Sequence, residues 1–154
     1  MTQDITNTIQ QFFTAVDMQD WDRARGLMTM PFFLDYSSFG APAGADMAPD
    51  QILTSWQGIL PGFDATHHQL GLLDIEAGAS MALVRAYVTA THYMASAQGG
   101  DLWTVYGTYT LQLRYEEGWK LRGNTFSFKF LSGNVDLPNL AKERMARDTA
   151  AQPA

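Results

Sequence analysis

The sequence predicts an α+β fold in which N-terminal helices pack on a strongly curved, mainly antiparallel sheet that encloses a pocket. Apolar residues follow helical spacing in the first part of the chain, whereas apolar and polar residues alternate from Ala65 onward. Composition adds a further observation: charged residues make up 17 % of the chain, against about 25 % in an average domain, and aromatic residues reach 12 %. Such a chain has a large apolar interior, a cavity lined by aromatic rings, or an associating surface.

Helical segments come first in the predicted order of elements. An amphipathic helix is predicted from apolar residues at helical spacing, namely Ile5, Ile9, Phe12, Phe13 and Val16. Asp20 is the expected N-cap of a second helix, and Pro31 is expected to end that helix. Residues 32–37 are predicted to form a short strand and residues 39–49 a loop. Pro49 then opens a third, short helix.

The sheet is predicted from four runs of alternating residues: Thr66–Ile75, Met81–Ala95, Leu102–Tyr115 and Trp119–Leu131. The tight turn Glu116–Gly118 connects the last two runs. Gly123 is a candidate bulge, so alternation does not assign the faces of the last run. We expect one domain over residues 1–136, a helix over Leu137–Arg147 and a frayed tail over Asp148–Ala154.

Composition also excludes several classes of function. The chain has no cysteine, which removes disulfides, thiolate metal sites and cysteine nucleophiles. Its net charge of −6 argues against nucleic acid or an anionic membrane as a partner. No apolar run approaches the ~18 residues that a membrane span needs, and the first ten residues are too polar for a signal peptide. We therefore expect a cytoplasmic protein.

Alternation along the strands places two histidines on the inner face of the sheet, because side chains at i and i+2 share a face. His92 shares its face with apolar and mostly small residues: Ala82, Val84, Ala86, Val88, Ala90 and Met94. The inner face of the first run carries His68 together with Thr66, Leu70 and Leu72. His67 is then expected to face outward.

Two tyrosines fall on apolar faces in the same way. Tyr109 lies on the apolar face of the third run, where Gly107 is expected to leave space beside it. Tyr36 continues the apolar face of the short strand. Small residues next to these side chains leave room for a cavity.

Asp17 lies one helical turn after Phe13, among aromatic residues. A buried carboxylate needs a partner, and His68 and His92 are the candidates. Each residue alone has a commoner structural explanation, such as a core histidine bonded to a backbone carbonyl, a packed tyrosine or a solvated aspartate. Together they predict a small-molecule pocket with a few convergent polar groups. Their spacing matches no metal-ligand signature, and no cofactor motif is present, so neither a metal nor a cofactor is expected.

Five short stretches, in their order and spacing, are similar to the SnoaL-like branch of the nuclear transport factor two-like superfamily, and within it to the scytalone dehydratases: Val16–Arg25, Leu34–Phe39, Ala65–His68, Val88–Tyr93 and Gly118–Leu121. The resemblance implies a cystatin-like cone. It also implies a homo-oligomer, a dimer or trimer formed through the sheet, with Phe126, Phe128 and Phe130 as candidate contacts.

The same resemblance implies roles for four residues. An aspartate–histidine pair shared by the dehydratases and the hexachlorocyclohexane dehydrochlorinases falls on Asp17 and His68. A tyrosine of the dehydratases falls on Tyr36, and a second histidine falls on His92. The chain departs from the dehydratases at Val16, where they have a tyrosine, and near Tyr109, where they have an asparagine. Residues 132–154 do not match their C-terminal lid, so a different substrate is expected.

The expected function is that of a dehydratase-like lyase that acts on an apolar, cyclic small molecule without a cofactor. His68 is the expected general base, oriented by Asp17, while His92 is a second acid–base group and Tyr36 polarises a carbonyl oxygen. The expected substrate contacts are Val16, Trp103, Tyr109 and Phe126. Two alternatives stay open: an isomerase or polyketide cyclase of the same fold, and a ligand-binding domain without catalysis.

Overall fold

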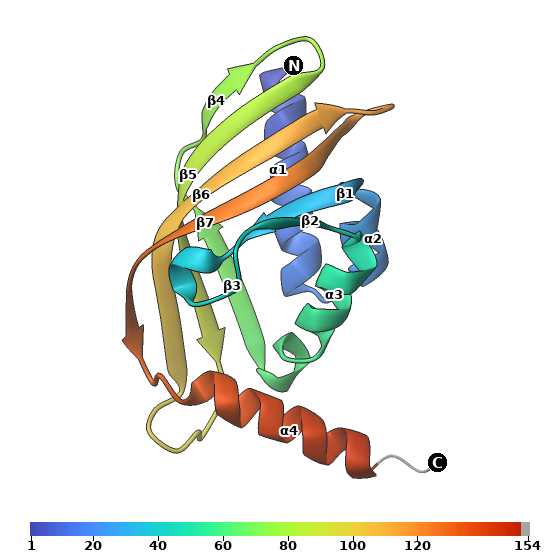
Figure 1. Ribbon diagram of the computed structural model, residues 1–154. Helices are drawn as coiled ribbons and strands as arrows, with labels where there is room; N and C mark the ends of the chain where they lie inside the picture. Colours follow the sequence, from blue (N-terminus) through green and yellow to red (C-terminus); the bar gives the residue numbers. More distant parts are fainter. Residues whose placement is uncertain (152–154) are drawn as a thin grey trace.

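Three long antiparallel strands form the centre of a curved sheet in the computed structural model, which describes residues 1–151 (Figure 1). The seven strands are β1 (Met28–Asp35), β2 (Ala45–Met47), β3 (Ala65–Leu70), β4 (Asp74–Ala77), β5 (Met81–Tyr93), β6 (Leu102–Tyr115) and β7 (Trp119–Gly133). Their order is β2-β1-β7-β6-β5-β3, and β4 also pairs with β5. Only the β1–β7 pairing is parallel, so the predicted mainly antiparallel sheet is confirmed.

Four helices complete the α+β fold: α1 (Thr2–Asp17), α2 (Trp21–Gly26), α3 (Pro49–Gln57) and α4 (Leu137–Ala151). Two single turns of 3₁₀ helix, η1 (Ser37–Phe39) and η2 (Leu60–Gly62), lie in the connections. The sheet curves around α1 and α3, whereas α4 lies across one end of the long strands (Figure 1). Among residues 1–151, none of the helices is both long and apolar enough to cross a membrane.

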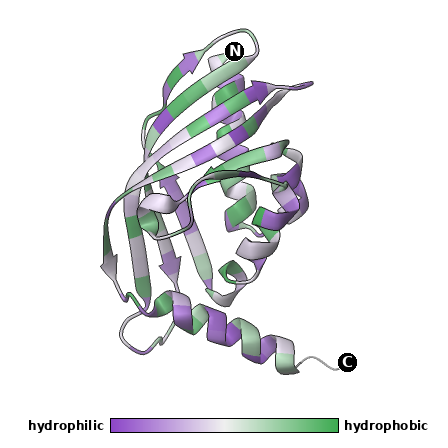
Figure 2. Cartoon of the chain, in the orientation of Figure 1, coloured by the Kyte–Doolittle hydropathy of each residue, from purple (hydrophilic) through white to green (hydrophobic). Residues whose placement is uncertain are grey.

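The periodicities of the sequence are confirmed by the packing. All five apolar residues that predicted the first helix are buried in the core, where they meet inner-face residues of β5 and β6 such as Val84 and Leu111. Along β5, every second residue from Ala82 to Met94 is buried. Figure 2 shows the corresponding alternation of hydrophobic and hydrophilic segments along the strands. The side chain of Asp20 accepts a hydrogen bond from the backbone N–H of Arg23, as expected of an N-cap.

The second helix and the strand after it differ from the prediction. The helix ends at Gly26, before Pro31, and Pro31 lies within β1. Proline is tolerated there because the pairing of β1 with β7 is interrupted between Met28 and Phe33, so no ladder hydrogen bond is lost. The predicted loop 39–49 also contains an edge strand, β2, which pairs with β1.

The first predicted β-run is two strands. β3 ends at Leu70, and β4 begins at Asp74. Leu72 lies in the break and is 99 % exposed, so its predicted place on the inner face was wrong. At the C-terminus, residues 148–151 continue α4 where a frayed tail was predicted, and residues 152–154 of that tail lie outside the described part of the chain.

Two register shifts in the β6–β7 pairing set the faces of β7. Gln112 pairs with Gly123 and Leu113 with Leu121, which confirms a bulge next to Gly123. Phe126 consequently points inward and is buried, so it does not belong to a surface for association. Phe130 lies on the outer face and is 56 % exposed. The predicted homo-oligomer stays a prediction.

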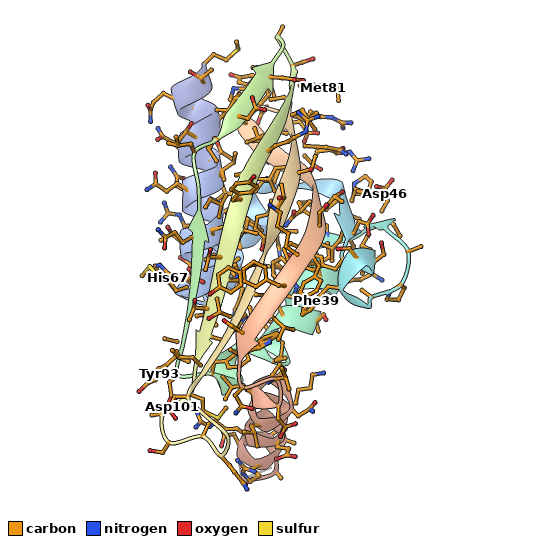
Figure 3. The ribbon with its side chains drawn as sticks, turned by 90° about the vertical axis from the view of Figure 1, so that its left-hand side faces the viewer. Phe39, Asp46, His67, Met81, Tyr93 and Asp101 are labelled. Atoms are coloured by element: carbon orange, nitrogen blue, oxygen red, sulfur yellow. The ribbon has the colours of Figure 1, made fainter. Side chains whose placement is uncertain are left out.

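The outer face of the long strands carries polar side chains together with exposed apolar and aromatic ones such as Tyr87 and Phe130. Side chains stand out on both sides of the long strands in Figure 3, which also locates His67 on β3 and Tyr93 at the end of β5. His67 is exposed, as predicted from its neighbour His68 facing inward.

The contact of α4 with the body of the protein depends on Gly62. A Cβ atom at this position would run into the backbone carbonyl of Ala141. We expect Gly62→Ala to lower the free energy of unfolding by about 1–3 kcal/mol, the usual cost of overpacking. Gly26→Ala is the control, because nothing lies within 4 Å of a Cβ added there. Urea denaturation of both variants checks this, and equal midpoints would contradict it.

Candidate active site

A cavity of about 290 Å³ lies between the helices and the concave face of the sheet. Its walls come from α1, β1, η1, α3, η2, β3, β5, β6 and β7. Its lining is aliphatic or aromatic except for two imidazoles and two phenols, and it holds no lysine, arginine, aspartate or glutamate side chain. The lining includes seven of the eight predicted site residues: Val16, Tyr36, His68, His92, Trp103, Tyr109 and Phe126. Asp17 lies behind His68, in a surface groove between α1 and β3.

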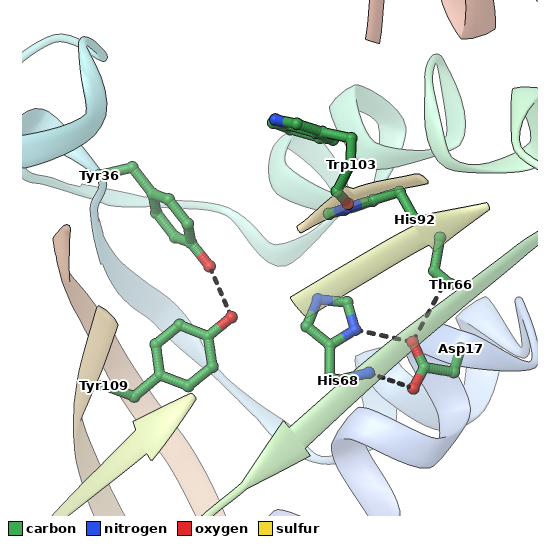
Figure 4. A network of polar contacts seen from close by, with 7 residues as sticks. All are labelled: Asp17, Tyr36, Thr66, His68, His92, Trp103 and Tyr109. Carbon is green, nitrogen blue, oxygen red and sulfur yellow. Dashed lines mark hydrogen bonds and ion pairs between the residues drawn. The ribbon is translucent and has the colours of Figure 1, made fainter. Parts of the chain in front are cut away.

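Asp17 and His68 form the closest polar contact of the site. The Nδ1 atom of His68 lies 2.7 Å from Oδ1 of Asp17, and the backbone N–H of His68 donates to Oδ2 over 2.9 Å (Figure 4). The last residue of α1 thus meets the middle of β3. With the Nδ1 proton directed to the carboxylate, Nε2 of the neutral imidazole carries the lone pair that can accept a proton.

Burial and hydrogen bonding act on Asp17 in opposite directions. Burial acts to raise the pKa of its carboxyl group, but the hydrogen bonds and charge interaction with His68, together with a hydrogen bond from Thr66, hold that pKa below its ordinary value. Asp17 is therefore ionised at neutral pH and can stabilise a protonated His68.

Thr66 is a contributor that sequence reasoning did not single out. Its hydroxyl donates to Oδ1 of Asp17 over 3.0 Å, so two side chains of β3 hold the same carboxylate oxygen. The available signal was its place two residues before His68, on the same face of one strand.

Removal of the Thr66 hydroxyl is expected to weaken the interaction between Asp17 and His68 without breaking it. In Thr66→Val, the pKa of Asp17 should rise, and the rate of a reaction that depends on His68 should fall by about three- to tenfold, the worth of one hydrogen bond. Thr66→Ser keeps the hydroxyl and is the control. The measurement is the pH–rate profile, and a profile of Thr66→Val that overlays the wild type would argue against a positioning role.

His92 does not pair with Asp17. Its Nδ1 lies 3.0 Å from the backbone carbonyl of Trp103, and a carbonyl can only accept, so the proton is on Nδ1. The ring packs against Phe63 and Trp103, and it faces His68 with ring centroids 6.3 Å apart. Burial is the main cause that lowers the pKa of His92 to about 4. At neutral pH it presents an unprotonated Nε2 to the pocket.

Two phenols, the buried Tyr109 and the partly buried Tyr36, occupy another wall of the cavity. The hydroxyls of Tyr36 and Tyr109 are hydrogen-bonded over 3.3 Å (Figure 4). The Nδ2 atom of Asn124 donates to the Tyr36 hydroxyl over 3.5 Å. Burial raises the pKa of both phenols, so both are protonated donors.

Asn124 was missed by the sequence reasoning, because the bulge beside Gly123 hid which face of β7 it belongs to. Its side chain is 2 % exposed, and Oδ1 is buried without a hydrogen-bond partner. The space expected beside Gly107 is also not free. A Cβ there would meet the backbone carbonyl of Ser127 and the ring of Phe126, so the glycine makes room for both.

The segment after β1 closes one side of the pocket. Ser38 in η1 accepts a hydrogen bond from the N–H of Phe128 and donates to the carbonyl of Phe126, which attaches η1 to β7. Phe39 thereby stacks on Phe128 and faces Trp103. No group of three or more potential metal-ligating side chains occurs in the part of the chain that the structure describes.

Comparisons with known proteins agree with this architecture. The family model described as "SnoaL-like domain" matches residues 2–123. A search of curated proteins gives no significant match. Among solved structures, the Kfla4162 protein from Kribbella flavida is similar with a TM-score of 0.81 and 20 % identity, over 92 % of this chain and 96 % of that one.

Two further similar structures bear the names of enzymes. A candidate scytalone dehydratase from Novosphingobium aromaticivorans has a TM-score of 0.72 and 18 % identity, over 86 % of each chain. A hexachlorocyclohexane dehydrochlorinase, LinA type 2, has a TM-score of 0.67 and 15 % identity, over 86 % of this chain and 93 % of that one. At identities this low, the structural similarity establishes a shared fold and no shared activity. The expected family and its cone-shaped α+β fold are confirmed.

Proposed function

Because the chain belongs to the SnoaL-like domain family, we propose that it is a dehydratase-like lyase that acts on a neutral cyclic small molecule by general acid–base catalysis. The observation that carries the proposal is the Asp17–His68 pair, whose imidazole lines a mostly apolar cavity. The dehydratase and dehydrochlorinase names of two similar structures support a reaction that removes a leaving group.

The first step is removal of a proton from carbon by Nε2 of His68. The electron pair of the C–H bond moves toward a neighbouring carbonyl, whose oxygen gains charge and accepts a hydrogen bond from a phenol of the pocket. Asp17 stabilises the imidazolium that forms. The electron pair then returns to form the C=C bond as the C–O bond of the leaving group breaks. His68 gives its proton to the departing hydroxide, so that water leaves and the base is regenerated.

His92 would act as a hydrogen-bond acceptor for the leaving hydroxyl. Its Nε2 is unprotonated at neutral pH, because burial lowers the pKa to about 4. A hydroxyl held at this nitrogen would lie close to His68, since the two rings meet edge to face with centroids 6.3 Å apart in the same cavity. His92 in this role orients the leaving group while His68 supplies the proton.

The lining also limits the substrate. No cationic or additional anionic side chain is available to compensate a charged group on the substrate. A carboxylate or phosphate would have to be buried without a partner, which is costly. Aromatic walls such as Trp103 and Phe126 suit a flat ring instead.

An isomerase or cyclase is the second candidate, and the low pKa of His92 favours it. With His92 unprotonated, a single base, His68, can move a proton between two positions of one substrate without loss of a group. Product mass separates the two reactions, because dehydration loses one water and isomerisation loses nothing.

The test uses a simple ketone as a probe. Incubation of the protein with 1-indanone in D₂O should replace the hydrogens next to the carbonyl by deuterium, measured by mass spectrometry. Candidate cyclic hydroxyketones are then screened for loss of water. A protein that binds 1-indanone but leaves its exchange at the rate in buffer would favour the ligand-binding alternative and count against catalysis.

A further inference from the structure

We propose that Tyr109 is a catalytic residue that donates the hydrogen bond to the substrate oxygen, with Tyr36 and Asn124 positioned behind it. This inference rests on the proposed function and names the donor within it. Tyr36 was the expected donor from the sequence, and Tyr109 was expected only to form part of the wall.

The number of hydrogen bonds that each phenol makes leads to Tyr109. The Tyr36 hydroxyl has two partners, Nδ2 of Asn124 and the hydroxyl of Tyr109, whereas the Tyr109 hydroxyl has Tyr36 as its one polar partner among the described residues. A phenol has one hydrogen to donate, and Tyr36 can direct its hydrogen to Tyr109 once Tyr109 donates to a ligand. The hydrogen of Tyr109 is then available to the cavity that both side chains line.

The ring of Tyr109 is held in place by neighbours that also hold the base. Phe13 stacks on Tyr109 with centroids 5.2 Å apart and an angle of 11°, and it also packs against the ring of His68 at 5.7 Å. Phe126 packs against the edge of Tyr109. Figure 4 shows both phenol hydroxyls turned toward the space in front of His68. Donor and base are thus fixed on two sides of one cavity before a substrate binds.

Asn124 acts as a positioning residue through Tyr36. A hydroxyl that accepts a hydrogen bond becomes a better donor, so the chain from Asn124 to Tyr36 strengthens the last donor, Tyr109. The amide has its nitrogen toward Tyr36, while Oδ1 is buried without a partner. An unpaired buried polar atom is energetically unfavourable. The hydrogen bond that Asn124 donates to Tyr36 gives a reason for its presence at this position.

The experiment compares 1-indanone with indane, which has the same rings and lacks the oxygen. Quenching of tryptophan fluorescence reports binding, since Trp56 and Trp103 line the cavity. The infrared carbonyl band of bound 1-indanone reports the hydrogen bond directly. Wild-type protein should prefer the ketone, and its bound carbonyl band should lie below the frequency found in a hydrocarbon solvent.

The matched variants are Tyr109→Phe and Tyr36→Phe, each of which removes one hydroxyl. Tyr109→Phe should return the band toward its hydrocarbon value and reduce the preference for the ketone by about three- to tenfold, the worth of one neutral hydrogen bond. Tyr36→Phe and Asn124→Leu should keep most of the band shift. Circular dichroism checks that each variant folds.

Several results would overturn the proposal. These are a wild-type protein without preference for the ketone, a band that is the same in Tyr109→Phe as in wild type, or a shift that disappears in Tyr36→Phe alone. Failure of the proposed function is separate, because it shows as deuterium exchange that does not depend on His68. If the carbonyl band depends on Tyr109 but the protein does not catalyse deuterium exchange, Tyr109 is still supported as the donor and the lyase function is rejected.

Discussion

Replacement of His68 by asparagine is expected to lower the rate of deuterium exchange into a bound ketone, or of turnover of a true substrate, by about 10²–10⁴-fold. Asparagine cannot accept the proton, although it can still bond to Asp17. The cavity keeps its other walls, so binding of 1-indanone should change far less than the rate.

Asp17→Asn is the companion variant. An uncharged amide at this position cannot stabilise the imidazolium, and its NH₂ group can turn the His68 ring to the wrong tautomer, so a large loss of rate is again expected. His67→Asn is the matched control, because His67 is the exposed neighbour on the other face of β3. Rates of His68→Asn and Asp17→Asn that both stay within about tenfold of the wild type, the low side of the range for a general base, would reject the mechanism.

Acid is expected to destabilise the fold through His92. The pKa of this side chain is about 4 in the folded protein, against an ordinary value of 6.5. Between these two values the unfolded chain binds a proton that the folded chain does not. The free energy of unfolding should therefore fall as the pH drops from about 6.5 to about 4, by about 3 kcal/mol in all.

The neighbouring carboxyl group does not produce this loss in the same window. The carboxyl group of Asp17 has a lowered pKa, so its contribution is lost only as the pH falls below its ordinary value of 3.8. The measurement is urea denaturation at several pH values from about 7 to about 4.5. His92→Gln should flatten the dependence, and His67→Gln should not. Equal slopes in wild type and His92→Gln would show that His92 is not the cause.

The local pattern of the sequence was enough to predict most elements and the direction of most inner side chains. Apolar spacing in α1 and alternation in β5 and β6 each reflect which face is buried, and burial of one face is a local property of a helix or strand. His68, His92 and Tyr109 were placed on inner faces for this reason. The low charge content fits the outcome as well, because the cavity walls hold few polar groups.

The sequence patterns gave wrong or incomplete predictions where pairing between strands that are distant in the sequence sets the local structure. Pro31 lies in a strand because β7 leaves that part of β1 unpaired, and Leu72 is exposed because the run breaks between its two pairings with β5. The faces of β7 depend on bulges set by β6, so Asn124 could not be assigned beforehand. Gly107 was expected to leave space beside Tyr109, and only the structure shows that the ring of Phe126 and the backbone carbonyl of Ser127 occupy that space.

Residue patterns and composition are enough to establish the α+β class, the absence of thiol groups and the small set of titratable groups that face the interior. How these groups pair depends on the tertiary structure. Asp17 had two histidines as possible partners, and the approach of α1 to β3 selects His68. The carbonyl of Trp103 on the neighbouring strand accepts the hydrogen bond from Nδ1–H of His92. A hydrogen bond requires approach to about 3 Å, and residues distant in the sequence reach that separation only when the sheet curves around the helix.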